Sequence, residues 1–318
     1  MLTHIAVDIG GTQMRAASYE SQTIEPLKIS RIPTRQAGQS ILERLFGLIA
    51  SIWPDHLPVE RIAVAAPGPL DPFEGMILSA PNIPEWVNLP LSQKLEERFQ
   101  VPVRLGNDAN LAALGEWKFG AGRGHRHLIY LTVSTGVGSG IIIDNELLLG
   151  NKGLAAELGH VTVLRDGPLC SCGKPGHLEA VASGTAIAQW VEQELAKGEV
   201  SILRNRAKIS TREIAEAAKS GDPLSVAALK RAGTFLGNAI ADYLHIFNPT
   251  IVIIGGGVSR SGEFLLEPLK KAIEKDVFNP HYLDNFSIAT AALGDDAGLL
   301  GALTLARGYS SSSISTYA

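Results

Sequence analysis

The amino-acid sequence predicts an α/β protein built from two similar halves, each offering a glycine-rich turn to a shared cleft. Two observations predict it. Strand-like and helix-like stretches alternate along the chain, which is typical of α/β folds. In addition, DIGGT at 8–12 and STGVGSG at 134–140 each leave one strand and enter the next, as in a hairpin. A Rossmann unit is different, because there the glycines lead into a helix.

Short continuous apolar runs predict buried strands in both halves. In the first half these runs lie at 4–9, 61–66 and 101–105. In the second half they lie at 127–135, 140–144, 250–257 and 286–293. QMRAASYE and KISRIPT follow the first run and are expected to continue it as a meander.

Helix signals separate these strands. Ser40 and Glu43 have the spacing of a capping box before apolar residues at helical intervals, which predicts a helix over 40–53. NDANLAALGEWKF predicts a helix opened by Asn107 or Asp108. Further helices are expected at 180–196, at 210–219 with a second capping box from Ser210 to Glu213, at 222–247 and at 295–306.

Composition and charge restrict the partners. The chain has 318 residues, of which 45% are hydrophobic and 19% charged, and its 33 glycines suit a soluble α/β enzyme rich in tight turns. The net charge of −4 argues against a general nucleic-acid or anionic-membrane binder. No secretory signal pattern and no run long enough to span a bilayer is found. We therefore expect a cytoplasmic protein without nucleic-acid or membrane partners.

The glycine turns suit a polyphosphate, because backbone N–H groups can approach it where no Cβ intervenes. Asp8, at a strand end beside the first turn, is placed to bind Mg²⁺ directly or through water. GGGV at 255–258 would let a base or ribose lie on bare backbone. The alternatives are plain hairpin turns and, for GGGV, a close crossing of helix and strand. The candidate nucleotide-binding residues are Gly10, Gly11, Thr12, Ser134, Thr135, Gly136, Gly138, Gly140, Gly255, Gly256 and Gly257.

Both cysteines of the chain lie in CSCGKPGHLE at 170–179. A disulfide between them would be badly strained, so thiolate chemistry in a reducing compartment fits better than a bridge. His160, Cys170, Cys172 and His177 form a set of two imidazoles and two thiols that suits tetrahedral Zn²⁺. The alternative is a glycine-rich loop with buried thiols.

A series of motifs, in order from about residue 4 to 306, resembles the ROK family of sugar kinases, and among them the ATP-dependent glucokinases. DIGGT by itself is shared with the wider actin-like ATPase group, whereas ELGH followed by CxCG is specific. The motifs are DIGGT, APGP at 66–69, PNIPEW at 81–86, GNDAN at 106–110, STGVGSG, ELGH at 157–160, CSCGKPGHLE and VIIGGGV.

The resemblance implies two ribonuclease-H-like domains, of the actin-like ATPase and hexokinase type, around a central cleft. We expect a small domain over 1–115 plus about 297–310, a large domain over 116–296 and a disordered tail at 309–318. Repressors of the family carry a winged helix-turn-helix before the first glycine turn, and we expect none here because that turn begins at residue 8. A homo-oligomer, either a dimer or a tetramer, is also implied.

By the same resemblance, Asp108 corresponds to the catalytic base of the family's NDxN pattern. The residues alone also allow a plain helix cap. A hexose needs a site dense in hydrogen-bonding groups. The residues matching the family's sugar ligands are Asn82, Asn107, Glu157, His160 and Glu179, with Gly68 letting the backbone approach the ring. Family members usually have a third cysteine where this chain has His177.

The predicted function is a kinase that uses ATP and Mg²⁺ to phosphorylate the 6-hydroxyl of a hexose, with glucose as the expected substrate. A structural Zn²⁺ is predicted to lie outside the reaction and to orient His160 and Glu179. The alternatives are a kinase for N-acetylmannosamine, fructose or allose, polyphosphate as the donor, and a non-catalytic sugar sensor. Asp108 and the two phosphate turns argue against a sensor, because a pure sensor needs no base.

Overall fold

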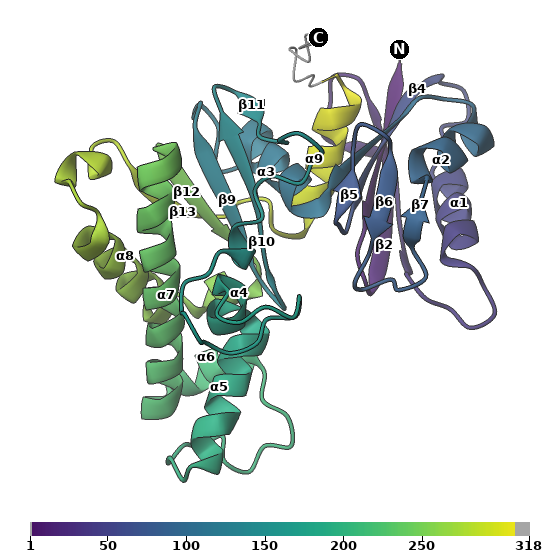
Figure 1. Cartoon of the computed structure of the whole chain (residues 1–318). Coiled ribbons are helices and arrows are strands. Elements are labelled where there is room, and N and C mark those ends of the chain that lie inside the picture. Colours follow the sequence, from purple (N-terminus) through teal and green to yellow (C-terminus); the bar gives the residue numbers. More distant parts are fainter. Residues whose placement is uncertain (1, 309–318) are drawn as a thin grey trace. The chain divides into compact units, whose positions relative to one another are not determined.

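The computed structural model describes residues 2–308 and divides into two compact units (Figure 1). Unit 1 contains the described residues up to Gly124, residues 140–156 and the described residues from Ala292 onward. Unit 2 contains His125–Ser139 and Glu157–Ala291. The predicted domain bounds differ from these units mainly at 140–156, which we had placed in the second domain. The predicted tail at 309–318 lies outside the described residues.

Unit 1 is built on a five-stranded sheet with the order β3-β2-β1-β4-β8. Its first three strands form the predicted antiparallel meander, and β4 and β8 add in parallel. Because β1 pairs on both sides and both its faces are covered, its apolar run is buried throughout. The bounds are β1 (Thr3–Ile9), β2 (Gln13–Glu20), β3 (Pro26–Pro33), β4 (Val59–Ala66) and β8 (Val103–Asn107).

The helices of unit 1 are α1 (Ile41–Ser51), α2 (Leu91–Phe99), α3 (Asp108–Phe119) and α9 (Ala297–Ala306). The predicted capping box at Ser40 is wrong, because Ser40 occupies the N-cap position but its side chain makes no capping hydrogen bond. At α3 the cap is Asn107, which accepts from the amides of Ala109 and Asn110. A small sheet of β5 (Leu70–Asp71), β6 (Met76–Ser79) and β7 (Val87–Leu89) has strands too short to show a periodic signal.

The second five-stranded sheet has the order β11-β10-β9-β12-β13. β9, β12 and β13 run parallel, and their continuous apolar runs, strongest in β9 and β12, were expected from the sequence. The boundary between the units falls within β10. The bounds are β9 (Leu128–Val133), β10 (Val137–Ile143), β11 (Glu146–Leu147), β12 (Ile251–Gly255) and β13 (Ser287–Thr290).

The α-helices of unit 2 are α4 (Leu178–Ala182), α5 (Gly184–Ala196), α6 (Thr211–Lys219), α7 (Pro223–Phe247) and α8 (Glu263–Asp276). The single helix expected at 180–196 is divided at Ser183, whose side chain caps α5 by accepting from the Ala186 amide. The capping box from Ser210 to Glu213 is confirmed at α6. Asp222 caps α7, which packs along α8 (Figure 1). None of the helices in residues 2–308 has the length and apolar character needed to cross a bilayer.

Candidate active site

The first glycine turn joins β1 to β2 in unit 1. The Gly10 amide donates to the Gln13 carbonyl at 2.9 Å. Thr34, from the loop after β3, donates its hydroxyl to the Gly10 carbonyl at 2.6 Å and its amide to the Thr12 carbonyl at 2.9 Å. A Cβ at Gly11 would lie 2.7 Å from the Cβ of Asn82. Glycine is therefore required for Asn82, a predicted sugar ligand, to lie against this turn.

Asp8, the predicted Mg²⁺ residue, is paired with Arg15. The Arg15 guanidinium lies 2.5 Å from Asp8 Oδ2 and 3.5 Å from Asp296 Oδ1, and it also donates to the Asp295 carbonyl. Burial raises the pKa of Asp8, and the pairing with Arg15 only partly opposes this effect. Carboxylate oxygens suit Mg²⁺, so the donor set fits this ion, which would share Asp8 with Arg15.

The predicted catalytic base lies at the start of α3. Asp108 occupies the first turn, where its Oδ1 accepts from the Ala109 amide at 2.8 Å. The partial positive charge at a helix N-terminus favours an ionised carboxylate. A Cβ at Gly68 would lie 3.0 Å from the Asn107 side-chain amide, so the APGP turn lies against the cap of the same helix. Three predicted sugar-site residues of unit 1, Gly68, Asn107 and Asp108, are thereby brought together.

The second glycine turn leaves β9 and enters β10. The Ser134 amide donates to the Gly136 carbonyl at 2.9 Å, and the Gly184 amide at the start of α5 donates to the Ser134 carbonyl at 2.7 Å. The Val137 amide donates to Glu179 Oε2 at 3.0 Å. A Cβ at Gly136 would lie 2.4 Å from the same oxygen. This turn therefore lies against Glu179, the predicted sugar ligand that precedes α5.

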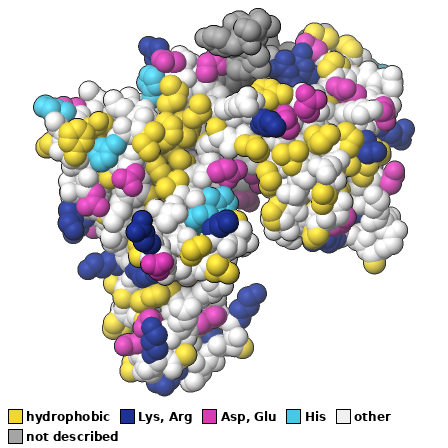
Figure 2. Space-filling view, in the orientation of Figure 1, with side chains coloured by type: hydrophobic (Ala, Val, Ile, Leu, Met, Phe, Trp, Pro, Cys, Tyr) yellow, Lys and Arg dark blue, Asp and Glu magenta, His cyan; other side chains and the backbone are white. Residues whose placement is uncertain are grey.

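A cavity of about 830 Å³ opens beside this turn, and unit 2 alone supplies its lining. Its volume is in the usual range for small-molecule sites. Figure 2 shows Lys and Arg side chains on the surface of the same part of the chain as α5 in Figure 1, although α5 itself carries none. The apolar lining residues are Ala188, Ile209, Ala215 and Val258, and the charged ones are Glu192, Lys208, Arg212, Glu216, Lys219 and Arg260. The part of the lining next to the glycine turn and to η2 (Gly257–Ser261) consists of Ser134, Thr135, Gly184, Thr185 and Gly257.

The three glycines at 255–257 serve different purposes. A Cβ at Gly255 would lie 2.5 Å from the Tyr130 hydroxyl, and one at Gly256 would lie 2.3 Å from the Val133 carbonyl. Gly256 also has a φ of 80°, which disfavours other residues. Only Gly257 lines the cavity, with open space where a Cβ would stand. The first two glycines therefore pack closely against the strand β9 and not at a crossing of helix and strand, whereas the third faces the cavity.

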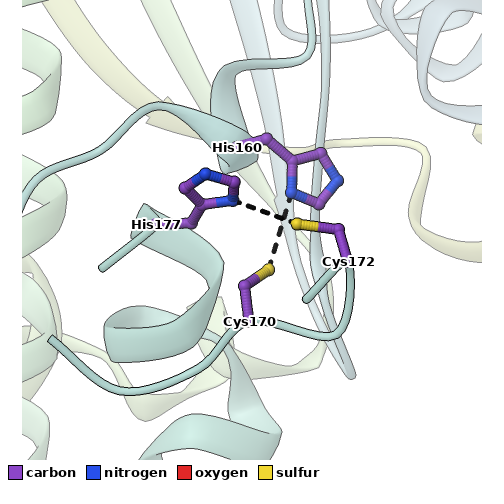
Figure 3. Close-up of side chains that lie close together, drawn as sticks. All are labelled: His160, Cys170, Cys172 and His177. Atoms are coloured by element: carbon purple, nitrogen blue, oxygen red, sulfur yellow. Dashed lines mark hydrogen bonds between the residues drawn. The ribbon is translucent and has the colours of Figure 1, made fainter. Parts of the chain in front are cut away.

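His160, Cys170, Cys172 and His177 form one cluster (Figure 3), with ligand atoms that all lie within 4.8 Å of one another. Cys170 Sγ lies 3.6 Å from His160 Nδ1, and Cys172 Sγ lies 3.3 Å from His177 Nδ1. In a tetrahedral zinc site, bond lengths of about 2.0–2.3 Å give neighbouring ligand atoms a spacing of roughly 3.3–3.8 Å. The four residues therefore fit a zinc ion.

Binding of a cation at Cys170 would require loss of the thiol proton. This thiol is buried, and burial raises its pKa to about 11. The thiolate is then unstable without a positive ion, whereas zinc binding would displace the proton. A Cβ at Gly176 would lie 1.8 Å from the Leu164 carbonyl, so the loop closes only with glycine at that position.

ELGH at 157–160 forms η1 (Leu158–His160) with Glu157 at its N-cap position. The Leu158 amide donates to Ser139 Oγ at 3.0 Å, and Tyr243 donates to the Leu158 carbonyl at 2.8 Å. Burial raises the pKa of Glu157, with His160 opposing this effect. His160 turns Nδ1 toward Cys170, so Nε2 is the ring nitrogen left for another partner.

The second predicted sugar carboxylate, Glu179, has a lowered pKa. Burial opposes its ionisation, but hydrogen bonds from Ser171, Val137 and Cys170 outweigh it. Glu157 and Glu179 thus lie near the cluster of His160, Cys170, Cys172 and His177 in unit 2.

Comparisons with known proteins agree with this architecture. Residues 4–309 match the sequence model described as ROK family. The chain belongs to the ROK family. A glucokinase of Thermotoga maritima is 38% identical over 95% of this chain and 96% of its own length. The xylose repressor of Caldicellulosiruptor bescii is 36% identical, but the aligned region spans 61% of its length.

Solved ROK structures confirm the fold class. A ROK family glucokinase from Streptomyces griseus, determined in complex with glucose and AMPPNP, matches with a TM-score of 0.79 and 36% identity over 96% of this chain and 99% of its own. The ROK hexokinase from Thermus thermophilus matches with a TM-score of 0.80 and 33% identity, over 96% and 97% of the two chains. The fold is therefore the mixed α/β actin-like ATPase fold with two sheet-containing domains.

Sequence reasoning missed the contribution of α5 and α6 to the cavity. Gly184 and Thr185 at the start of α5, and Thr211 and Arg212 at the start of α6, all line it. The sequence signal that could have indicated these residues is the serine at the N-cap of each helix, Ser183 and Ser210. Such caps mark helix N-termini, whose backbone amides can bind an anion.

Proposed function

We propose that this ROK protein is an ATP-dependent glucokinase. The observation that carries the proposal is its likeness, over nearly the whole of both chains, to the Streptomyces griseus glucokinase solved with glucose and AMPPNP. Glucokinases of Thermotoga maritima and Streptomyces coelicolor support it, because they match over 96% and 97% of their own lengths.

Asp108 is the proposed general base. It accepts the proton of the sugar 6-hydroxyl as that oxygen attacks the γ-phosphorus, while the bond from the γ-phosphorus to the β–γ bridging oxygen breaks and ADP leaves. Its place in the first turn of α3 suits this role, because negative charge is stabilised near a helix N-terminus.

Each unit contains residues that are proposed as sugar ligands. They are Gly68, Asn82 and Asn107 within unit 1, and Glu157, His160 and Glu179 within unit 2. Carboxylates accept hydrogen bonds from sugar hydroxyls, and the amide side chains of asparagine both donate and accept. Groups of this kind can distinguish hydroxyls that differ only in direction.

The nucleotide is proposed to bind in the cavity of unit 2. The apolar lining from Ala188, Ala215 and Val258 suits a base, and the turn at 134–138 offers backbone amides to phosphates. Gly10, Gly11 and Thr12 are the proposed phosphate-binding residues of unit 1. This apolar lining favours ATP over polyphosphate, which has no base. Mg²⁺, held near Asp8, would offset the charge of the transferring phosphoryl group.

Zinc at His160, Cys170, Cys172 and His177 is proposed to be structural. It would hold the His160 ring in one tautomer and orientation and would fix the loop that leads to Glu179. The residues that act on the sugar are then positioned by the ion, which takes no part in the transfer.

The test is a coupled ADP-release assay with glucose, N-acetylmannosamine, fructose and allose, on the wild type, Asp108→Asn and the matched control Asp166→Asn. We expect glucose to give the highest kcat/KM, and kcat to fall at least about a hundredfold in Asp108→Asn only. Undiminished turnover in that variant would overturn the mechanism. Glucose binding without turnover of any hexose would favour the sensor.

A homo-oligomeric state, dimer or tetramer, and a cytoplasmic location stay predictions. Light scattering of the purified protein tests the first of them.

A further inference from the structure

Glu179 joins two parts of unit 2 that are separate in the sequence. Its Oε2 accepts from the Val137 amide in the second glycine turn at 3.0 Å. Its Oε1 accepts from the Ser171 hydroxyl at 2.6 Å and from the Cys170 thiol at 3.3 Å. The same carboxylate is therefore bonded to the turn proposed for phosphates and to the loop proposed for zinc.

Ser171 stands between the two cysteines and is not one of the proposed metal ligands. Its hydroxyl donates to Glu179 Oε1 at 2.6 Å, whereas the Cys170 thiol, a weak donor, lies 3.3 Å from the same oxygen. Ser171 is therefore the stronger of the two side-chain donors to Glu179 Oε1.

We infer that Ser171 is a positioning residue that holds Glu179 against the second glycine turn, so that hexose affinity and nucleotide affinity are linked through this carboxylate. The inference rests on the proposed glucokinase function. A carboxylate has about four acceptor sites. With Ser171 on one oxygen and Val137 on the other, one site on each oxygen stays available for sugar hydroxyls.

The linkage follows from the geometry of the turn. Phosphate binding at 134–138 restrains the backbone that donates to Glu179, and Glu179 in turn is the proposed acceptor for the sugar. Binding of either ligand then favours the arrangement that the other requires, and such coupling of affinities is reciprocal. Removing the Ser171 hydroxyl frees one end of the carboxylate and weakens this link.

The experiment compares the wild type with Ser171→Ala, Ser171→Thr and the matched control Ser220→Ala, whose hydroxyl contacts only the Glu216 carbonyl of its own helix among the described contacts. Zinc content is measured first. Glucose Kd is then measured by calorimetry with and without AMPPNP, and kcat and KM in the coupled assay. Hydrogen exchange at the Val137 amide gives a readout that needs no sugar.

We expect Ser171→Ala to keep its zinc, to raise glucose Kd and KM about tenfold and to change kcat much less, since one hydrogen bond to a charged group is lost. The effect of AMPPNP on glucose Kd should shrink, and exchange at Val137 should rise. Ser171→Thr should restore both, because threonine keeps the hydroxyl. Ser220→Ala should behave as the wild type.

Two results would overturn the inference: unchanged glucose affinity in Ser171→Ala, or loss of zinc together with the affinity, which would mean that Ser171 maintains the loop. If the wild type binds no hexose, the glucokinase proposal and the sugar link fall together. Faster exchange at Val137 in Ser171→Ala would still support the positioning of Glu179.

Discussion

The two glycine turns use the same backbone device but hold their neighbours by different chemistry. In unit 1, the turn at 10–12 is covered by donors: Thr34 bonds to its carbonyls, and Arg35 donates to the Asn82 carbonyl at 2.8 Å. In unit 2, the turn at 134–138 is held by an acceptor, Glu179, which is tied to the cysteine and histidine cluster. The first arrangement needs neither a metal nor an ionised carboxylate, whereas the second is sensitive to both.

The glycines of the two turns also differ in what they touch. The missing Cβ at Gly11 would meet the Cβ of Asn82, which can move only with its backbone. The missing Cβ at Gly136 would meet the carboxylate end of Glu179, which can rotate away. The first contact is a matter of packing, and the second is a matter of side-chain direction.

Metal removal should have the largest effect and should act on one unit. A chelator that strips zinc should weaken glucose binding about tenfold to a hundredfold, as expected when groups that orient a binding residue are lost. Hydrogen exchange should rise over 157–179 and stay unchanged over 8–15. Zinc should restore both properties and Mg²⁺ should not. A metal-free protein with normal glucose affinity would contradict the proposed role of the cluster.

Alanine substitutions at Gly11 and Gly136 should distinguish an effect on packing from an effect on the direction of the Glu179 side chain. Gly11→Ala should lower the free energy of unfolding by about 1–3 kcal/mol, because the new Cβ would overlap the Cβ of Asn82. Gly136→Ala should change stability less but should raise the KM for glucose. Urea unfolding and steady-state kinetics measure the two effects. Gly47→Ala is the control, because a Cβ there meets nothing within 4 Å. This variant should stabilise α1 slightly, because alanine favours the helical conformation more than glycine does. Equal stability losses at Gly11 and Gly136 would remove the distinction.

A second carboxylate of unit 2, Asp222, also holds its neighbours by accepting hydrogen bonds, and we expect its contribution to stability to change at acid pH. This buried carboxylate accepts from the Ser225 amide and hydroxyl at 2.9 and 2.6 Å and from the Ile202 amide at 3.0 Å, and so holds the loop that leads to the cavity. Burial opposes its ionisation, but these hydrogen bonds outweigh it and lower its pKa. Asp222→Asn should cost about 1–2 kcal/mol at neutral pH.

The sign of the pH effect follows from the lowered pKa. The contribution of Asp222 to stability is present above its unfolded pKa of about 3.9 and is lost as the pH falls through its folded pKa. The difference between the wild type and Asp222→Asn should therefore shrink below about pH 4. Urea unfolding at several pH values measures it, and a difference that grows on acidification would contradict this assignment.

The smallest effect is expected at Arg35. Its side chain is half exposed and donates to the Asn82 carbonyl, so Arg35→Ala should raise the KM for glucose only about twofold to fivefold. Lys271→Ala, which removes an exposed pair with Glu267 on α8, is the control and should leave KM unchanged. If Arg35→Ala weakened glucose binding as much as metal removal does, the two units would not differ in how strongly sugar binding depends on a single contact.

Much of the fold and part of the site were predictable from local patterns. The strands β1, β4, β9 and β12 lie within apolar runs, and the caps Ser210 and Asp222 precede helices with clear periodicity. The metal cluster was predictable because its ligands lie close together in the sequence. By contrast, the division of a helix at Ser183 and the missing capping bond at Ser40 depend on rotamers and packing that spacing does not encode.

The sequence by itself determined most of the elements, the glycine turns and the cluster of two cysteines and two histidines, because each depends on residues near one another in the chain. The tertiary structure decided which neighbours those elements have. It brought Glu179 within hydrogen-bonding distance of the Val137 amide and left only Gly257 of the three glycines at 255–257 facing the cavity. It also placed the buried Glu116 carboxylate where it accepts from the amides of Ala292 and Leu293 at 3.1 and 2.8 Å. Such contacts join residues far apart in sequence, and packing selects them only when the sheets and helices have come together.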